Sequence, residues 1–575
     1  MIRKTSVHGT LNLISNVDNY LTEKTREKYH NETEWFNVFL SQVTNRIEED
    51  IFFPLYCSDN GAPNAPIRVM FAMLVLKERA GWSYDALQEN SLGNIFVRRA
   101  LGLFNFDDIV PCRATIFNFL KRLREYEIET GEDLFKKAYE AVTQGQILEF
   151  NVMGNKTRMD SALIGSNIKW LSRFELIYET LRYAYSKTKI ELIGLLTESE
   201  LETLKEMAGE RSDAVSYRST TPELKSKIES FGPLYHKIIK VMQESKNEAI
   251  ETLRKVFDQQ YEVVGDSVNP LPAEKIKASS IQSPHDTDCH FNRKNDQEVK
   301  GYTANIIETN NPDNLVNLIT SATIAPASTH DSKLFMEAIE DTERVTGQQI
   351  KTVNTDATYH SASNQEACKN KGIDHIKSAL TCNKIFYDYI FDENGDLIAT
   401  ELSTGETFKC EKVKHKKDST KTTWYFNNSK GRRIEVTEGN INYRYLLREL
   451  KSRNKEEINL RNNVEATIHQ VKYYLRGGKT LYRKNFRQKI WVMGRCMGIN
   501  NNRITKYLKD YKELLRTYVE LLITLVRAGV SLAFLLNISS FLFKLSYKML
   551  FVLGVTQIID GISLIFGKKR YNLGF

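Results

Sequence analysis

Between residues 158 and 372, strand-like and helix-like segments follow one another in an order that restricts the fold to a mixed sheet. The run RMDSALIG (158–165) is short and apolar and predicts a buried strand. Two β-branched runs, 301–309 and 315–327, flank the turn-forming residues NNPDN and predict a hairpin. Together the three strands would form an antiparallel meander.

The next two segments continue this sheet. Residues 330–345 have the periodicity of an amphipathic helix, and 350–359 predict a further short strand. A strand reached through a crossover helix runs parallel to its neighbour, so this fourth strand is expected beside the first. SASNQEACKNKG (361–372) predicts another helix, closed by Gly372. We therefore predict an α/β fold with a mixed sheet in the RNase H-like arrangement.

Two insertions interrupt this core. From 171 to about 263 the sequence is helical and charged, with a capping-box pattern at Thr197 and Glu200, which predicts a large helical insert. From 374 to 445, alternating residues and the turns ENGD and STGE predict a β-rich insertion. We assign the core to 151–373 and 446–516, and expect the second part to carry a polar helix.

The two ends of the chain lie outside this core. In residues 1–150 we predict short helices, one of them basic and led by Thr115, typical of a small helical DNA-binding domain; an ordinary helical bundle is the alternative. Residues 517–575 predict an apolar helical tail. Its uncharged runs are shorter than the roughly 18–20 residues of a membrane span. We expect buried helices or an oligomer contact there; a membrane association is the less favoured alternative.

Positive charge is concentrated in one segment. The chain has a formal net charge of +8, whereas residues 451–516 contain 17 Lys or Arg and 5 Asp or Glu, a local net charge of +12. The remainder of the chain is therefore slightly acidic. A concentrated basic block is typical of a protein that binds a phosphate backbone, although a solvated helical face has the same composition.

The cysteines and the first residues indicate a cytoplasmic protein. Seven Cys are irregularly spaced and form no CxxC pair, so we expect reduced thiols, with neither a zinc site nor a disulfide framework. The first 20 residues contain no continuous apolar run, and no secretory signal is expected.

Three acidic residues stand out by their positions. Asp160 lies inside the first predicted strand, where an unpaired carboxylate would be costly to bury. Asp356 ends the fourth strand, and Glu465 lies on the helix after the β-rich insertion. If the first and fourth strands are neighbours and the helix crosses them, the three carboxylates converge.

Such a cluster needs a cation, because like charges at close range raise each other's pKa. All-oxygen ligands suit Mg²⁺ or Mn²⁺. We expect two such ions per site, about 3.5–4 Å apart, a spacing that serves phosphodiester chemistry.

The helix with Glu465 has a basic stripe. Arg461, Glu465, His469 and Lys472 fall on one face at 3.6 residues per turn. A metal-binding carboxylate flanked by Arg and Lys is reasonable where that face meets a phosphate. The alternative is an ordinary surface pair between Arg461 and Glu465.

Several blocks together resemble one family. The chain is similar to bacterial insertion-sequence transposases of the DDE class, in the group whose last helix carries Arg-x3-Glu-x6-Lys, and more narrowly it resembles group 1182 of insertion sequences. The blocks that carry the resemblance begin with PIRVMFAML (66–74), MDSALIGSNIKW (159–170), ASSIQSPHD (278–286), VNTDATYHS (353–361) and NNVEATIHQVK (462–472).

The resemblance implies a site and its partners. Asp160, Asp356 and Glu465 would be the catalytic, metal-binding triad. DNA contacts would come from the basic segment and from one aromatic residue of the β-rich insertion, for which sheet packing is the alternative: Arg461, Lys472, His469, Arg476, Lys479, Arg483 and Trp424.

The implied activity is metal-dependent cleavage of DNA at the element ends, followed by strand transfer into target DNA. The expected partners are double-stranded DNA, as inverted-repeat ends and target, and a second copy of the chain in a homodimer on paired ends. The expected location is the bacterial cytoplasm, in association with the nucleoid. The alternatives are an RNase H-like hydrolytic nuclease or domesticated transposase, and a catalytically silent DNA-binding protein.

Overall fold

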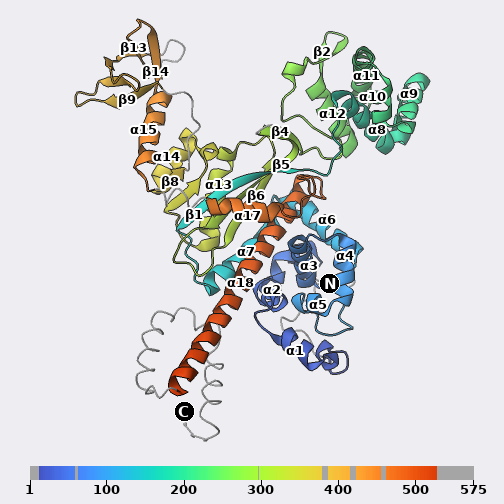
Figure 1. Ribbon diagram of the computed structural model, residues 1–575. Helices are drawn as coiled ribbons and strands as arrows, with labels where there is room; N and C mark the ends of the chain where they lie inside the picture. Colours follow the sequence, from blue (N-terminus) through green and yellow to red (C-terminus); the bar gives the residue numbers. More distant parts are fainter. Residues whose placement is uncertain are drawn as a thin grey trace. The chain divides into compact units, whose positions relative to one another are not determined.

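A computed structural model describes residues 12–57, 63–294, 297–377, 386–414, 422–454 and 462–527 (Figure 1). The chain divides into two compact units. The first comprises 1–152, 313–318 and 497–575, and the second comprises 153–312 and 319–496.

The described part of residues 1–152 is built from helices. The α-helices are α1 (Glu23–His30), α2 (Trp35–Gln42), α3 (Ile67–Ala80), α4 (Tyr84–Gly93), α5 (Ile95–Ala100), α6 (Arg113–Thr130) and α7 (Leu134–Glu149). The apolar helix α3 is buried along almost its whole length and ends at Gly81 in the left-handed conformation (φ 67°). Ser83 then caps α4 by accepting a hydrogen bond from the Ala86 amide at 3.0 Å.

The second unit contains a six-stranded mixed sheet. Its strands are β1 (Lys156–Gly165), β4 (His290–Lys294), β5 (Gln297–Thr309), β6 (Ile319–Pro326), β7 (Thr352–Thr355) and β8 (Asp374–Lys377). The order is β4-β5-β1-β7-β8, and β6 also pairs with β5. The β5–β6 hairpin is antiparallel, and β1 pairs with β7 in parallel. The predicted hairpin and the predicted pairing of the first and fourth strands are confirmed.

Helices cover both faces of this sheet. On one face α13 (Phe335–Thr346) packs Phe335 and Ile339 against Met159 and Ile307, which lie opposite each other on β1 and β5. On the other face α17 (Asn462–Lys472) packs on β1. The Thr467 hydroxyl on α17 donates to Glu308 Oε2 of β5 at 2.9 Å.

The strand register then tells which face Asp160 occupies. Glu308 lies opposite Arg158. Since side chains alternate along a strand, Asp160 shares the α17 side with Arg158.

The predicted helical insert is present. It comprises α8 (Arg173–Leu192), α9 (Glu198–Gly209), α10 (Ser212–Arg218), α11 (Thr221–Val241) and α12 (Glu248–Gln260), followed by the hairpin β2 (Tyr261–Val264) and β3 (Ser267–Pro270). The helices have a hydrophobic core of their own, which includes Leu181, Tyr235 and Leu253. The predicted capping box at Thr197 and Glu200 opens α9.

The β-rich insertion begins later than predicted. It consists of two three-stranded sheets. The first contains β9 (Tyr387–Phe391), β10 (Leu397–Glu401) and β11 (Thr407–Lys409), and the second contains β12 (Glu411–Lys414), β13 (Thr422–Asn427) and β14 (Arg433–Thr437). The helix α15 (Glu438–Ser452) follows. Residues 374–377 pair with β7 instead, so the main sheet extends past the expected boundary at 373.

The last helix departs from the predicted division at 516. Helix α18 (Asn485–Arg527) is continuous, and its residues from 497 onward group with the first unit. Most of the predicted apolar tail lies outside the described residues. Within the described part of the chain, no helix has the length and apolarity needed to cross a membrane.

The six described cysteines have free thiols. Cys57 and Cys112 are exposed, whereas four are buried: Cys289, Cys368, Cys410 and Cys496. Cys382 lies outside the described residues.

Candidate active site

Asp160 and Asp356 lie level with each other on neighbouring strands. The parallel register pairs Arg158 on β1 with Asn354 on β7, and each strand reaches its aspartate two residues further on. Asp160 is 8% exposed. Asp356 is half-buried and follows directly after β7, with an extended backbone. The sequence therefore predicted the position of both acids correctly, because the parallel pairing of the two strands fixes it.

A buried phenol lies among these acids. Tyr359 is fully buried, and its hydroxyl donates to Asn305 Oδ1 at 2.6 Å. Burial raises the pKa of Tyr359 well above its usual range, and the negative charges of Asp331, Asp160 and Asp356 raise this pKa further. The Tyr359 hydroxyl is therefore neutral.

Asp356 is held in place by its own loop. Its Oδ1 accepts a hydrogen bond from the Thr358 amide at 2.9 Å and another from the Thr358 hydroxyl, so that it caps the short helix η6 (Ala357–Tyr359). The same hydroxyl lies 2.8 Å from Asp331 Oδ2. One proton is therefore shared between two carboxylates, and Thr358 links Asp331 to Asp356.

Asp331 is a site residue that the sequence did not reveal. It begins the short helix η5 (Asp331–Lys333) and is largely buried. In the sequence it is only the acid after His330 at the start of a predicted helix, where acids are common for electrostatic reasons. The Asn364 side chain ties the two short helices together, donating to the carbonyls of Ser332 (2.8 Å) and Tyr359 (2.9 Å).

Glu465 does not complete a metal cage in this structure. It is exposed on α17, next to the buried Val464, on the helix that covers the Asp160 side of the sheet. Among the described residues, no three His, Cys, Asp or Glu side chains lie close enough together to hold a metal ion. The structure therefore brings two of the three predicted acids together and places the third on the covering helix.

The chemistry of the paired acids fits a hard divalent cation. Mg²⁺ is usually held by one or two carboxylates, with water and substrate phosphates as the other ligands. Asp160 and Asp356 can supply those carboxylates, and Asp331 adds a further negative charge beside them.

Most of the predicted DNA-contact residues follow Glu465 along the chain. Arg461 lies outside the described residues. His469 and Lys472 are on α17, and the His469 ring packs edge-on against Tyr473.

The segment 473–484, which we call the strap, connects α17 to α18. The Gly478 carbonyl accepts a hydrogen bond from the Gly165 amide (2.8 Å), and the Thr480 amide donates one to the Gly165 carbonyl (3.0 Å).

The strap therefore holds its basic residues at the end of β1. Arg476 is exposed, whereas Lys479 and Arg483 direct their nitrogens at backbone carbonyls of residues 168 and 167. The DNA contacts of Arg476, Lys479 and Arg483 stay predictions.

Trp424 has a packing role. It is 8% exposed in the core of the β-rich insertion, where its ring meets Phe391 edge-on at 6.0 Å between centroids. Phe426 and Val436 belong to the same core. Because this burial leaves little of the indole for a base, it favours the sheet-packing alternative, and the DNA contact of Trp424 stays a prediction.

Two family models match the chain. Residues 25–122 match the model described as Transposase domain (DUF772), and residues 293–501 match the one described as Transposase DDE domain. The DDE match includes Asp356 and Glu465, whereas Asp160 precedes it. No curated protein and no solved structure matches the chain.

The DDE match identifies an enzyme that cleaves DNA and transfers its strands, a polynucleotidyl transferase. The two matches together place the chain among the DDE transposases of insertion sequences. Neither match separates group 1182 from other groups, so that narrower resemblance is not confirmed. Enzymes of this family generally depend on a divalent metal and act on DNA.

Proposed function

We propose that Asp160, Asp356 and Glu465 form the catalytic triad of this transposase, in a core of the RNase H-like type. The register of β1 and β7, which sets the two aspartates side by side, is the observation that carries the proposal. Glu465 lies on the helix that packs on β1, on the Asp160 side of the sheet. The proposal requires the Glu465 carboxylate to approach the aspartates when substrate and metal bind.

The triad would hold two Mg²⁺ or Mn²⁺ ions. Their chemistry would be to activate a water or a DNA 3′-hydroxyl as the nucleophile and to stabilise the leaving oxygen. The contribution of the chain is to hold and orient. The Thr358 amide and hydroxyl hold Asp356, and the β1 backbone holds Asp160. In this proposal Lys472 and Arg476 neutralise phosphates of the bound DNA. No Ser, Cys or His nucleophile is needed for this chemistry.

In this proposal the enzyme cleaves at the inverted-repeat ends of its element and joins the freed 3′-hydroxyls to target DNA. We extend the proposal to a homodimer that holds two ends together and to action at the nucleoid. The family matches favour a transposase over the two alternatives considered from the sequence, a hydrolytic nuclease and a silent DNA-binding protein.

A strand-transfer assay tests this function. The purified full chain is incubated with an element-end duplex, a target plasmid and Mg²⁺. We expect cleaved ends followed by joined products. Cleavage without any joined product, over the full range of end sequences and metals, would instead indicate a hydrolytic nuclease.

Removing the Thr358 hydroxyl should weaken the site. Thr358→Val removes the hydrogen bond to Asp356 and the link to Asp331, and we expect cleavage to fall about 10- to 100-fold, the usual effect of losing a hydrogen bond that orients a metal ligand. Thr358→Ser keeps the hydroxyl and is the matched control, with near wild-type cleavage. The second measurement is the affinity for Mn²⁺ by electron paramagnetic resonance, which should fall in the Val variant alone. Equal Mn²⁺ affinity in both variants would show that Thr358 does not orient the ligand.

A further inference from the structure

Trp170 is an exposed aromatic residue beside the strap. It lies in the loop 166–171, between β1 and α8, and is 43% exposed. In contrast to Trp424, its indole remains accessible at the surface of the second unit. A single exposed aromatic residue is not unusual and does not by itself indicate a binding site, so the residues around it must be considered.

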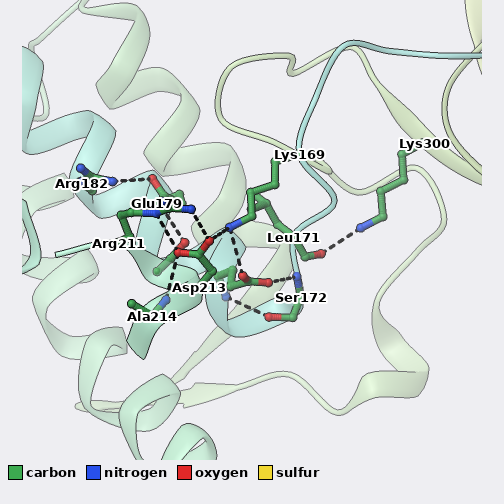
Figure 2. Close-up of polar contacts among 11 residues, drawn as sticks. Lys169, Leu171, Ser172, Glu179, Arg182, Arg211, Asp213, Ala214 and Lys300 are labelled. Carbon is green, nitrogen blue, oxygen red and sulfur yellow. Dashed lines mark hydrogen bonds and ion pairs between the residues drawn. The ribbon is translucent and has the colours of Figure 1, made fainter. Parts of the chain in front are cut away.

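Three cations converge on the backbone of this loop. Arg483 Nε donates to the Asn167 carbonyl at 2.7 Å, and Lys479 Nζ donates to the Ile168 carbonyl at 3.1 Å. Lys300 Nζ, from β5, donates to the Leu171 carbonyl at 2.9 Å, a bond that Figure 2 shows. The loop thus gathers positive charge from two segments that are far apart in the sequence.

The two lysines also lie against the indole. Lys300 Nζ is 5.7 Å and Lys479 Nζ is 5.8 Å from the centroid of the Trp170 ring. These are cation–π distances. Because each ammonium is also bonded to a carbonyl of the same loop, the ring is held in a fixed position while a large part of its surface stays exposed.

Two nearby acids, Asp213 and Glu175, pair with other cations. Lys169 pairs with Asp213 at 2.9 Å and with Glu175 at 3.6 Å, and Arg211 pairs with the same Asp213 (Figure 2). Within the described part of the chain, no carboxylate forms an ion pair with the three cations that meet the loop carbonyls. Their charge is therefore available to an external anion.

Hydrogen bonds fasten the loop 166–171 to its neighbours. The Asn167 amide donates to the Tyr482 carbonyl at 3.0 Å, which fastens the loop to the strap. Beneath them Asp286 is fully buried and accepts hydrogen bonds from the hydroxyls of Ser166 and Tyr302. A binding surface that is held in place before the ligand arrives loses less entropy when it binds.

We propose that Trp170, with Lys300, Lys479 and Arg483, forms a docking platform for single-stranded DNA. The indole stacks on an unpaired base, and the cations bind the phosphates on either side of it. Duplex DNA keeps its bases stacked inside the helix and exposes a base face only at its terminal pair, so the platform favours unpaired nucleotides. The inference deepens the proposed function, because cleaved or distorted ends supply such nucleotides. The platform begins at Gly165, five residues along β1 from Asp160, roughly 17 Å at the rise of a strand.

Binding measurements without divalent metal test the platform on the full chain. The probes are a blunt element-end duplex and the same duplex with a short single-stranded overhang. We expect Trp170→Ala to weaken binding of the overhang duplex about tenfold and to leave binding of the blunt duplex within about twofold. Trp170→Phe should retain most of the affinity. Tyr217→Ala, at an aromatic residue of the helical insert that is 93% exposed, is the matched control and should change neither.

A second measurement uses the wild-type chain and does not depend on the folding of a variant. Replacing the overhang bases by abasic sites should cost about as much affinity as Trp170→Ala. Equal losses on both duplexes, or no loss on the overhang duplex, would overturn the platform. Because metal is absent, this binding does not depend on the triad. If Asp356→Asn loses cleavage but still binds the overhang duplex, or Trp170→Ala loses that binding while Asp356→Asn still cleaves, the two proposals are separated.

Discussion

Asp160→Asn and Asp356→Asn should each lower the rate of end cleavage by about a thousandfold or more. A metal ligand contributes several kcal/mol of transition-state stabilisation, and ~4 kcal/mol corresponds to a thousandfold change in rate. Asn preserves the shape of the side chain and, at 356, the oxygen that accepts from the Thr358 amide, so the fold should persist. The measurement is single-turnover cleavage of an element-end duplex in Mg²⁺, together with duplex binding, which we expect to stay within about twofold.

A charge-removing control separates the site from its surroundings. Glu366→Gln removes an exposed carboxylate on α14 (Ala362–Lys371), the helix that follows the Asp356 loop, and should cleave like the wild type. Cleavage that survives in Asp160→Asn would contradict the assignment of the site. Glu465→Gln tests the third member: a loss as large as that of the aspartates supports the triad, whereas normal cleavage makes Asp331 the next candidate.

The parts of this fold that the sequence predicted depend on local patterns with a non-local consequence. A short apolar strand, a hairpin, a crossover helix and another strand allow few arrangements, and these arrangements predict Asp160 beside Asp356. The helical insert was equally evident, because helical periodicity and the Thr197 capping box are local signals.

The parts that the sequence missed depend on packing between distant segments. Trp424 and Trp170 are the same residue type, yet the first is buried by two small sheets and the second remains exposed. Asp331 belongs to the site because its carboxylate bonds the hydroxyl of Thr358, 27 residues later in the chain. Residues 374–377 looked like the start of an insertion because nothing in four residues indicates which sheet they join.

Glu308→Ala should destabilise the second unit by about 3–5 kcal/mol. Glu308 is fully buried, and its carboxylate pairs with Arg158 and accepts from the Thr467 hydroxyl. Removing one partner of a buried ion pair leaves the other charge uncompensated, and this has the quoted cost. Urea unfolding measures the change in free energy. As the control, the double variant Arg158→Met, Glu308→Leu removes both charges and should recover most of the lost stability.

The double variant also distinguishes stability from position. The bond between Thr467 and Glu308 is a buried polar contact of α17 with the sheet, and α17 carries Glu465. Replacing the ion pair by apolar side chains restores a packed interior but leaves the Thr467 hydroxyl without this acceptor. If the bond orients α17, the double variant should recover most of the lost stability and still cleave about tenfold more slowly, the scale of a lost hydrogen bond. Full recovery of both stability and cleavage would show that packing alone positions the Glu465 helix.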